Sequence, residues 1–345
     1  MRIAVVVSSD LSGGAEQYLV RLYSRLITEP GVEAVLIGAS PGWDEELGPT
    51  IAVRTDRKLS MKRGRAKQAF RALGDRRRLA AEVTRARPDV VHIQFFREKL
   101  ILPHRLFKRL PVIWTEHGVL PRNFPRVGLW ILRRNAMRAH VVAVSEIVAR
   151  SLEAEQIESD VIWNPLPPPV ERASKPDVVL WAGRVVESKR AHLLVEAARR
   201  LPELTFVVAG DGSARSVLES QSPDNLKFVG HVDLRSTWLP KARVVVHTSG
   251  MEAREGSPMI MLEARASGIP FLMASDCDAA REAESLGCVL YEPAPGALAE
   301  AIRKSVEGGT DVPLSNQILA DRGEQVWYER HRELFFRYAR KSRVA

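Results

Sequence analysis

The stretch E-A-R-E-G-S-P-M-I-M-L-E-A-R-A-S-G, residues 252–268, decides how the rest of this sequence is interpreted. It comes directly after a short apolar run that is typical of a buried strand. Gly256 allows an unusual backbone bend, Ser257 can cap a helix, and Pro258 suits the first helical position. The following residues are good helix formers, and Gly268 is a common residue just beyond a helix end. The stretch therefore predicts a strand, a bend and a helix in succession.

The start of this helix, near Met259, is suited to an anion. Unpaired backbone N–H groups and the positive end of the helix dipole point outward there, so a phosphate group is favoured. Glu255 lies in the bend, and Glu263 lies roughly 8 Å further along at ~1.5 Å per residue. A diphosphate with a sugar on either side would bring hydroxyl groups near both carboxylates. Alternatively, Glu255 only complements the helix dipole and Glu263 is a solvated surface residue, and the stretch alone leaves both interpretations open.

A second motif, G-R-V-V-E-S-K at Gly183 to Lys189, also follows an apolar strand and leads into a helix. Arg184 and Lys189 can converge on one diphosphate, because the guanidinium offers a forked contact and the ammonium a point charge. An ordinary pair of solvated side chains is the alternative.

Together, the two motifs resemble the signature of the family 4 nucleotide-sugar glycosyltransferases, which have the two-domain GT-B fold and retain the anomeric configuration. The resemblance implies that Arg184 and Lys189 neutralise the diphosphate of the donor. Glu255 would then hold hydroxyls of the donor sugar and Glu263 the ribose, with help from the backbone at 256–259. Since two cations and a helix dipole can replace a metal ion at the phosphates, we expect no divalent-ion requirement.

Two sites in the first half of the chain fit the same resemblance. An apolar N-terminal run is followed by Gly13, Gly14 and an amphipathic helix, which predicts the first βα unit of a parallel doubly wound sheet. Paired glycines allow close approach to a sugar or phosphate, although a plain tight turn is equally consistent. The segment Thr115–Gly118 reads T-E-H-G at the end of a buried strand. The resemblance implies that His117 faces the donor sugar, and a histidine hydrogen-bonded within a loop is the alternative.

The predicted fold is α/β, with two Rossmann-like doubly wound domains that face a cleft. We expect an acceptor-binding domain at residues 1–165, a nucleotide-sugar-binding domain at residues 166–322, and a C-terminal helix at residues 323–345 that packs back on the first domain. The proline-rich run Leu166–Pro169 marks the boundary, because proline cannot continue a sheet interior. Trp327, Leu334 and Phe335 could anchor the closing helix.

Three further positions in the second domain are counted among the donor-binding residues. Gly183 and Gly210 follow strands, and Val232 lies at the edge where family members read the nucleotide base with backbone groups. Asp276 and Asp278 form a D-x-D motif, which in other folds holds a divalent metal. We interpret it here as accidental and expect no metal and no cofactor. A UDP-sugar is favoured as the co-substrate.

Length and composition indicate a globular protein with two cores. The 345 residues are 45% hydrophobic and 27% charged, unlike a disordered chain. No apolar run approaches the ~18 residues needed to span a membrane. Cys277 and Cys288 are the only cysteines, which argues against a disulfide framework or a C-x-x-C metal site. These observations predict a cytoplasmic protein, with peripheral attachment to the inner face of the membrane as a further expectation.

The excess positive charge lies in the first half of the chain. The window from Arg54 to Arg87 contains 13 basic residues against three acidic ones, on a predicted helical segment from Met61 that breaks near Gly74. Docking on an anionic lipid surface is the functional interpretation, and a solvated helical face is the alternative. Apolar side chains with flanking arginines could insert alongside: Phe124, Leu129, Trp130, Ile131 and Leu132, with Arg122, Arg126, Arg133 and Arg134.

Two other classes of function compete. A non-enzymatic binding module for nucleic acid or anionic membrane would explain the basic charge. Nucleic acid is disfavoured as a partner, because no basic strand carries the interleaved aromatic residues that stack bases. A nucleotide-sugar epimerase lacks the paired glutamates and the R-x-x-x-x-K spacing. We therefore predict a retaining hexosyltransferase that uses a nucleoside-diphosphate sugar and a glycan or glycolipid acceptor of the cell envelope or of a polysaccharide. Its predicted catalytic residues are His117, Arg184, Lys189 and Glu255.

Overall fold

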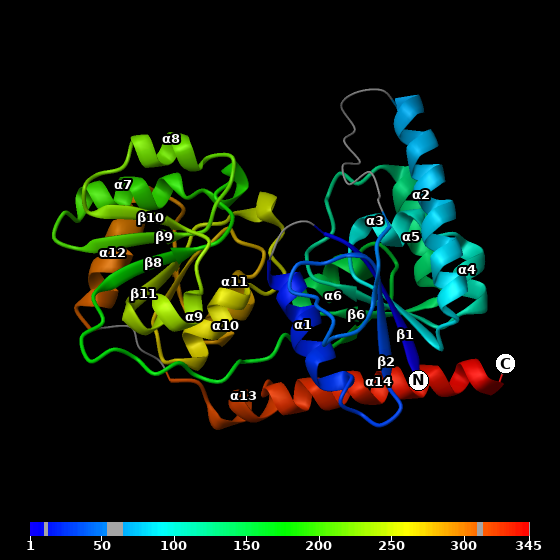
Figure 1. Ribbon diagram of the computed structural model, residues 1–345. Coiled ribbons are helices and arrows are strands. Elements are labelled where there is room, and N and C mark those ends of the chain that lie inside the picture. The colour runs from blue at the N-terminus through cyan, green and yellow to red at the C-terminus, as the bar shows by residue number, and fades with distance from the viewer. Residues whose placement is uncertain (10–12, 54–64, 309–312, 345) are drawn as a thin grey trace. The chain divides into compact units, whose positions relative to one another are not determined.

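The chain divides into two compact units, each built around its own parallel sheet (Figure 1). The first unit comprises Met1–Trp163 and Trp327–Ala345, and the second comprises Asn164–Val326. The computed structural model describes residues 1–9, 13–53, 65–308 and 313–344. The sequence placed the changes of domain at residues 165 and 322, and the chain passes between the units at Trp163 and again at Val326.

Among the described residues, the first unit has a sheet of seven parallel strands in the order β3-β2-β1-β4-β5-β6-β7. Its strands are β1 (Arg2–Ser8), β2 (Glu33–Ala39), β3 (Thr50–Ile51), β4 (Val90–Ile93), β5 (Val112–Glu116), β6 (Ala139–Ala143) and β7 (Asp160–Val161). Its helices are α1 (Gly14–Leu26), α2 (Arg65–Ala86), α3 (Phe96–Ile101), α4 (His104–Arg109), α5 (Arg126–Ala136) and α6 (Glu146–Glu153). The central strands are apolar at successive positions, because helices cover both faces of a parallel sheet.

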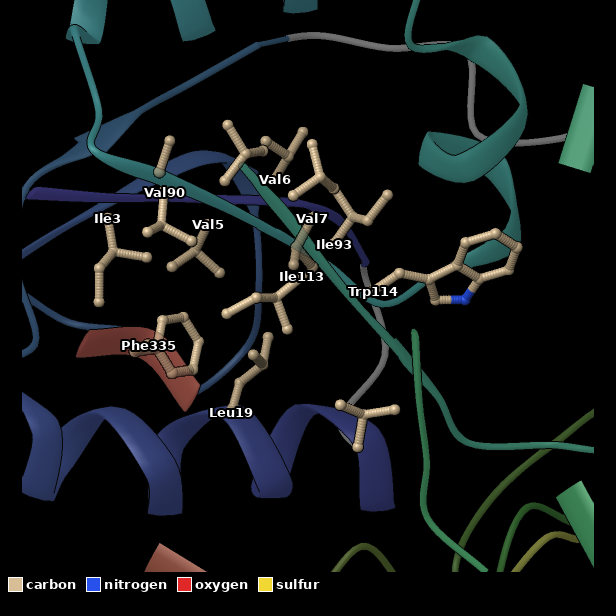
Figure 2. Close-up of a cluster of buried hydrophobic side chains, with 14 of the residues drawn as sticks. Ile3, Val5, Val6, Val7, Leu19, Val90, Ile93, Ile113, Trp114 and Phe335 are labelled. Atoms are coloured by element: carbon tan, nitrogen blue, oxygen red, sulfur yellow. The ribbon is translucent and has the colours of Figure 1, made fainter. Parts of the chain in front are cut away.

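The C-terminal helix α14 (Glu324–Val344) supplies side chains to the core of the first unit. Phe335 of α14 and Leu19 of α1 point toward the strands of the sheet in the same buried cluster (Figure 2). The ring of Phe335 meets the ring of His92 edge-on, with centroids 5.4 Å apart. Trp327 and Leu334 are also buried in this core. Burial of each such side chain contributes about 1.5–3 kcal/mol.

In the part of the second unit that the structure describes, six parallel strands follow the order β10-β9-β8-β11-β12-β13. They are β8 (Val178–Ala182), β9 (Thr205–Ala209), β10 (Leu226–Gly230), β11 (Ala242–His247), β12 (Phe271–Ala274) and β13 (Val289–Tyr291). The helices are α7 (His192–Arg200), α8 (Arg215–Ser220), α9 (Leu234–Thr237), α10 (Met259–Ala266), α11 (Ala280–Ser285), α12 (Pro295–Val306) and α13 (Asn316–Asp321). Three short 3-10 turns accompany them: η1 (Glu187–Lys189), η2 (Leu239–Lys241) and η3 (Met251–Ala253).

Alternate side chains of strand β8 enter two different cores. Val179 and Trp181 share one buried cluster with α7 and α12, whereas Val178 and Leu180 share another with α10 and α11. This two-residue alternation places helices on both faces of the sheet. The second unit is therefore doubly wound, as the sequence predicted.

Both sheets reverse their strand order at one place. In the first sheet, β2 and β3 are added on one side of β1, and β4 to β7 are added on the other side. In the second sheet, β9 and β10 lie on one side of β8, and β11 to β13 lie on the other side. In open α/β sheets, ligands bind beyond the carboxyl ends of the strands at this reversal. Each unit therefore has one edge where a ligand site is expected.

Helix α2 differs from the sequence prediction. It runs without a break from Arg65 to Ala86, through Gly74. A glycine inside a helix costs only about 1 kcal/mol relative to alanine, which the surrounding turns outweigh. The prediction of a break near Gly74 is wrong.

Candidate active site

Lys189 and Glu255 meet beyond the strand-order reversal of the second sheet. Lys189 ends the turn η1 that follows β8, and Glu255 follows β11 and the turn η3. Their charged groups form an ion pair, and their side chains are 16% and 15% exposed. Oε1 of Glu255 also accepts a hydrogen bond of 3.3 Å from the hydroxyl of Ser249. The fold thus joins two of the predicted catalytic residues, which come from different motifs.

Arg184 adds positive charge near this pair. Burial and the positive charge of Arg184 lower the pKa of Lys189 to about 8, so the amine is still charged at neutral pH. Arg184 itself is exposed, in the loop directly after β8. Two cations and one carboxylate leave a net positive charge, which suits a diphosphate.

A buried hydroxyl group forms a hydrogen bond with the backbone of Lys189. Oγ1 of Thr248 donates a 2.5 Å hydrogen bond to the carbonyl oxygen of Lys189 and accepts a 2.9 Å hydrogen bond from the indole of Trp181. Trp181 is 1% exposed, so this chain of hydrogen bonds is anchored in the core. The core therefore holds the backbone at the end of the turn η1 through Thr248.

Glycines allow the loops after β8 and β9 to pack with their backbones in direct contact. Gly183 (φ 156°) and Gly210 (φ 133°) adopt backbone conformations that favour glycine, and a Cβ on Gly210 would clash with the carbonyl oxygen of Gly183. The amide of Gly183 donates to the oxygen of Ala209 at 3.0 Å. These glycines place the Arg184 loop, and direct contact of either with a donor stays a prediction.

The start of helix α10 differs from the sequence prediction. The helix begins at Met259, with Pro258 in the N-cap position and no side-chain cap. Gly256 lies in the bend, but the left-handed residue there is Arg254, with φ 54°. The predictions of Ser257 as the cap and Pro258 as the first helical residue are wrong.

Ser257 has a different partner. Its hydroxyl donates a 2.9 Å hydrogen bond to Oε1 of Glu282, a buried carboxylate that also pairs with Arg322. A charge-assisted bond of this kind is about twice as strong as a neutral one, so it displaces the capping interaction. The amide of Asn164 donates to the carbonyl oxygen of Ser257 at 3.2 Å. These contacts hold the chain where it enters α10.

Glu263 and Val232 differ in their environment. Glu263 lies on α10 and its side chain is buried. Its Oε1 is 3.9 Å from the guanidinium of Arg235. The alternative that Glu263 is a solvated surface residue is therefore wrong. Val232 follows β10 and is 39% exposed. The contact of Glu263 with the ribose stays a prediction, and so does the contact of Val232 with the nucleotide base.

The D-x-D motif contributes to an ion-pair network. Arg190 donates to Asp276 at 2.7 Å and to Glu252 at 3.0 Å. Asp276 thus already has a cationic partner from the loop after β8. Within the described part of the chain, no three or more His, Cys, Asp or Glu side chains are grouped to hold a metal ion.

His247 lies beside Glu255 and was not predicted from the sequence. It is the last residue of β11 and 4% exposed, and its Nε2 lies 3.7 Å from Oε1 of Glu255. Burial and the charge of Lys189 lower the pKa of His247 to about 3, which keeps the ring neutral. A polar residue at the end of the apolar run V-V-V-H is the only sequence signal for it.

In the first unit, His117 follows β5 and is half-buried beside Gln94 and Tyr18. Its Nε2 lies 3.0 Å from Oε1 of Gln94, and its ring meets the Tyr18 ring edge-on with centroids 4.8 Å apart. Burial, with a contribution from the charge of Lys99, lowers the pKa of His117 to about 3. His117 is therefore a neutral hydrogen-bonding group near the carboxyl end of its sheet.

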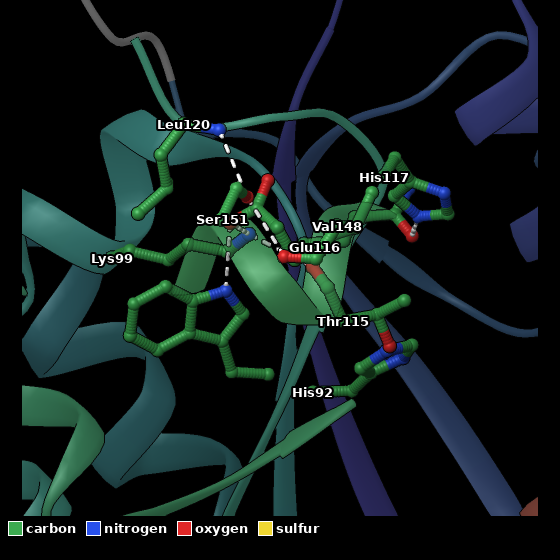
Figure 3. Close-up of polar contacts among 10 residues, drawn as sticks. His92, Lys99, Thr115, Glu116, His117, Leu120, Val148 and Ser151 are labelled. Carbon is green, nitrogen blue, oxygen red and sulfur yellow. Dashed lines mark hydrogen bonds and ion pairs between the residues drawn. The ribbon is translucent and has the colours of Figure 1, made fainter. Parts of the chain in front are cut away.

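A fully buried ion pair supports the strand that leads to His117 (Figure 3). The ammonium of Lys99 is 2.9 Å from Oε2 of Glu116 and donates to the carbonyl oxygen of Thr115 at 2.8 Å. The indole of Trp114 also donates to Oε2 of Glu116, at 3.1 Å. These bonds hold the carbonyl group of Thr115 and the side chain of Glu116, directly before His117.

The glycine pair in the first unit forms the start of α1. Gly13 takes the N-cap position in an extended conformation, and Gly14 is the first helical residue. A Cβ on Gly13 would come within 3.0 Å of the Glu16 carboxylate, so the turn has little spare room. Contact of Gly13 or Gly14 with a ligand stays a prediction.

Residues 54–64 of the basic window, which carry five of its 13 basic residues, lie outside the described residues. Within the described part of α2, Arg76, Arg77 and Arg78 are exposed. No described helix combines the length and the apolar character that a membrane crossing requires.

Two sequence profiles cover most of the chain. The profile described as Glycosyltransferase Family 4 matches residues 12–168, and the profile described as Glycosyl transferases group 1 matches residues 176–307. The chain belongs to the family 4 glycosyltransferases. A comparison with curated protein sequences finds no significant match.

Solved structures show that this glycosyltransferase has the GT-B fold. HepE of Anabaena, crystallised with UDP-glucose, is 19% identical with a TM-score of 0.77, covering 97% of this chain and 99% of HepE. Sucrose-phosphate synthase of Thermosynechococcus elongatus is 16% identical with a TM-score of 0.76, covering 98% of each chain. A putative UDP-N-acetylglucosamine 2-epimerase of Listeria monocytogenes is 13% identical with a TM-score of 0.64, covering 96% of this chain and 94% of that one. Because an epimerase shares the fold, the fold alone does not define the reaction.

Proposed function

We propose that this glycosyltransferase moves a hexose from a nucleoside-diphosphate sugar to a hydroxyl group of its acceptor, with retention of the anomeric configuration. The observation that carries the proposal is the meeting of Lys189 and Glu255, beside Arg184, at the strand-order reversal of the second sheet. A cation for a diphosphate and a carboxylate for sugar hydroxyls are the two groups that such a donor needs.

The two cations have a direct role in the proposed chemistry. When the glycosidic bond to the diphosphate breaks, negative charge develops on the leaving oxygen. Arg184 and Lys189 would stabilise that charge electrostatically, which lowers the barrier. Glu255 would bind sugar hydroxyls, and no divalent metal is needed for these roles. The contact of His117 with the donor sugar, implied by the family, stays a prediction because the contacts described for His117 lie within its own unit.

A UDP-sugar is the donor to test first, since HepE was crystallised with UDP and with UDP-glucose. We expect UDP to raise the melting temperature, with GDP and ADP compared in parallel. Saturation at a hundred times the dissociation constant adds ~2.7 kcal/mol. The shift should survive EDTA and should be lost in Lys189→Met. Lys175→Met, at an exposed lysine that precedes β8, is the matched control. No shift with any diphosphate would contradict the proposal.

For the acceptor, we propose a glycan or lipid-linked saccharide of the cell envelope or of a polysaccharide, reached by peripheral docking on an anionic membrane. Helix α5 supports this. Val127, Trp130 and Met137 are 72%, 59% and 83% exposed at helical spacing on α5 and its C-cap. Arg126 and Arg134 are exposed among them, and no acidic residue occurs between residues 122 and 138. Apolar side chains surrounded by arginines suit the headgroup region of an anionic bilayer.

The structure changes which apolar residues are assigned to this surface. Leu132 is 1% exposed and belongs to the core, so its predicted insertion is wrong, whereas Val127 and Met137 were not predicted. Trp130→Ser should weaken sedimentation with phosphatidylglycerol vesicles about tenfold, as expected from the loss of one buried aromatic side chain. Val217→Ser in the second unit, which is 56% exposed, is the control. Equal sedimentation of the two variants would contradict the docking proposal.

A further inference from the structure

One polar atom at the candidate donor site has no assigned role. Nε2 of His247 is buried and has no hydrogen-bond partner among the described residues. It lies 3.7 Å from Oε1 of Glu255, longer than the ~2.9 Å of an N–H···O hydrogen bond. A buried polar atom without a partner costs about 1–3 kcal/mol, so a role in another state of the site would explain its presence.

The ion-pair partner of Glu255 has a proposed role of its own. This partner is Lys189, which is the group expected to bind a diphosphate. A diphosphate would compete with Glu255 for the ammonium group of Lys189 and would weaken this ion pair. When a diphosphate takes the ammonium, Glu255 loses its counter-charge while it remains 15% exposed. A carboxylate that must then orient sugar hydroxyls needs another donor.

His247 is fixed where such a donor is required. The hydroxyl of Tyr291 donates to the carbonyl oxygen of His247 at 3.1 Å, and the imidazole ring lies 6.0 Å from the ring of Phe271. The backbone of His247 is therefore hydrogen-bonded at the end of β11, and its ring is buried there. Ser249 provides the second contact to the same carboxylate oxygen, at 3.3 Å. A shift of Glu255 of roughly 1 Å would bring its carboxylate into hydrogen-bond distance of Nε2, in the ring tautomer that carries its proton on this nitrogen.

We propose that His247 is a positioning residue for the donor sugar. It donates a hydrogen bond from Nε2 to the carboxylate of Glu255 when Lys189 moves to the diphosphate. This inference rests on the proposed function. Its consequence is that His247 affects the sugar part of the donor and not the nucleoside diphosphate. Binding of the diphosphate and binding of the sugar are then coupled, because the first releases Glu255 for the second.

The test compares the affinities of the purified full chain for UDP and for UDP-glucose by calorimetry. His247→Leu removes the donor, and His247→Gln keeps an N–H in a side chain of similar reach. In His247→Leu, we expect UDP affinity within twofold of the wild type. The additional affinity for UDP-glucose over UDP should fall about tenfold, as for the loss of a hydrogen bond to a charged group. His247→Gln should recover part of it. His140→Leu in the first unit is the matched control and should change neither affinity.

The outcomes separate the inference from the proposed function. If the wild type binds no nucleoside diphosphate, the proposed function fails and the inference fails with it. If the wild type binds UDP and UDP-glucose but His247→Leu loses both affinities equally, the role of His247 is structural and the inference is overturned. Equal behaviour of His247→Leu and the wild type also overturns it. In both of these cases the proposed function stands.

Discussion

The side-chain oxygen of Gln94 accepts a hydrogen bond of 3.0 Å from Nε2 of His117. The amide nitrogen of Gln94 donates to the carbonyl oxygen of Ala15 at 2.9 Å, which defines the orientation of the amide group. His117 therefore carries its proton on Nε2 and has an acceptor lone pair on Nδ1. The contact also connects the start of α1 to the residue after β5.

Replacement of Gln94 should change the orientation of His117. In Gln94→Leu, His117 loses its acceptor, and we expect the rate of sugar transfer to fall about three- to tenfold, the size of one neutral hydrogen bond. Gln94→Glu keeps an acceptor for His117 and should retain more activity. The measurement is the initial transfer rate, with UDP affinity as the control, because Gln94 belongs to the first unit. An unchanged rate in Gln94→Leu would contradict the orienting role.

The buried pair of Lys99 and Glu116 should be essential for stability as a pair. Lys99→Met leaves the Glu116 carboxylate buried without its counter-charge, and we expect the free energy of unfolding to fall by about 3–5 kcal/mol. Lys99→Met combined with Glu116→Gln removes both charges and should recover much of this loss. Denaturant unfolding of the two variants and the wild type measures the difference. If the double variant is as unstable as Lys99→Met, the loss comes from packing.

Stability should decrease in mild acid because of three buried histidines and the half-buried His117. Burial lowers the pKa of His117 and His247 to about 3 and of His331 to about 4, and it also lowers that of His92. In the unfolded chain these rings take up protons near pH 6.5, whereas the folded protein keeps them neutral. The unfolded state therefore binds more protons below pH 6.5. The stabilisation present above pH 6.5 is lost as the pH falls, by up to about 1.4 kcal/mol per unit for each histidine.

The melting temperature between pH 7.5 and 4.5 tests this expectation. His331→Gln should make the profile flatter, since one of the four rings no longer titrates on unfolding. His231→Gln, at an exposed position after β10, is the control and should leave the slope unchanged. A melting temperature that is constant down to pH 4.5 would show that these histidines do not govern acid stability.

The two loops at Gly183 and Gly210 should not tolerate a side chain. Gly210→Ala combines a strained φ with a clash against the carbonyl oxygen of Gly183, and we expect a loss of about 2–5 kcal/mol. Gly268→Ala has a positive φ of 64° but open space around the added Cβ, and should cost about 1 kcal/mol. Thermal unfolding measures both. Similar losses in the two variants would mean that conformation, and not close approach, explains Gly210.

Local sequence patterns predicted the fold because each pattern lies within one strand and the helix that follows it. The apolar runs at β1, β8 and β11 and the glycines after them identified βα units, and the spacing of Lys189 and Glu255 from their strands placed both in loops beyond the carboxyl ends. Helix α14 was also readable, from Trp327, Leu334 and Phe335 on one apolar face. The fold class and the family membership are confirmed.

Side chains whose partners are distant in sequence could not be predicted in this way. Ser257 reads as a helix cap, and only the approach of Glu282 and Arg322 gives its hydroxyl a stronger partner. The sequence left open whether Glu263 is a ligand-binding or a solvated residue, and only packing around α10 shows that it is buried. His247 has no sequence signal except its place at the end of an apolar run.

The sequence by itself determined which elements form and which residues stand beyond the ends of strands, because hydrophobic periodicity and turn chemistry act over a few residues. Only the tertiary structure decided which charges meet. The ion pair of Lys189 with Glu255, the burial of Lys99 against Glu116, and the place of His247 beside Glu255 depend on strand order and on the depth at which each side chain is covered. Electrostatic interactions vary steeply with distance and with exposure to water, and these quantities are defined only when the sheets are assembled.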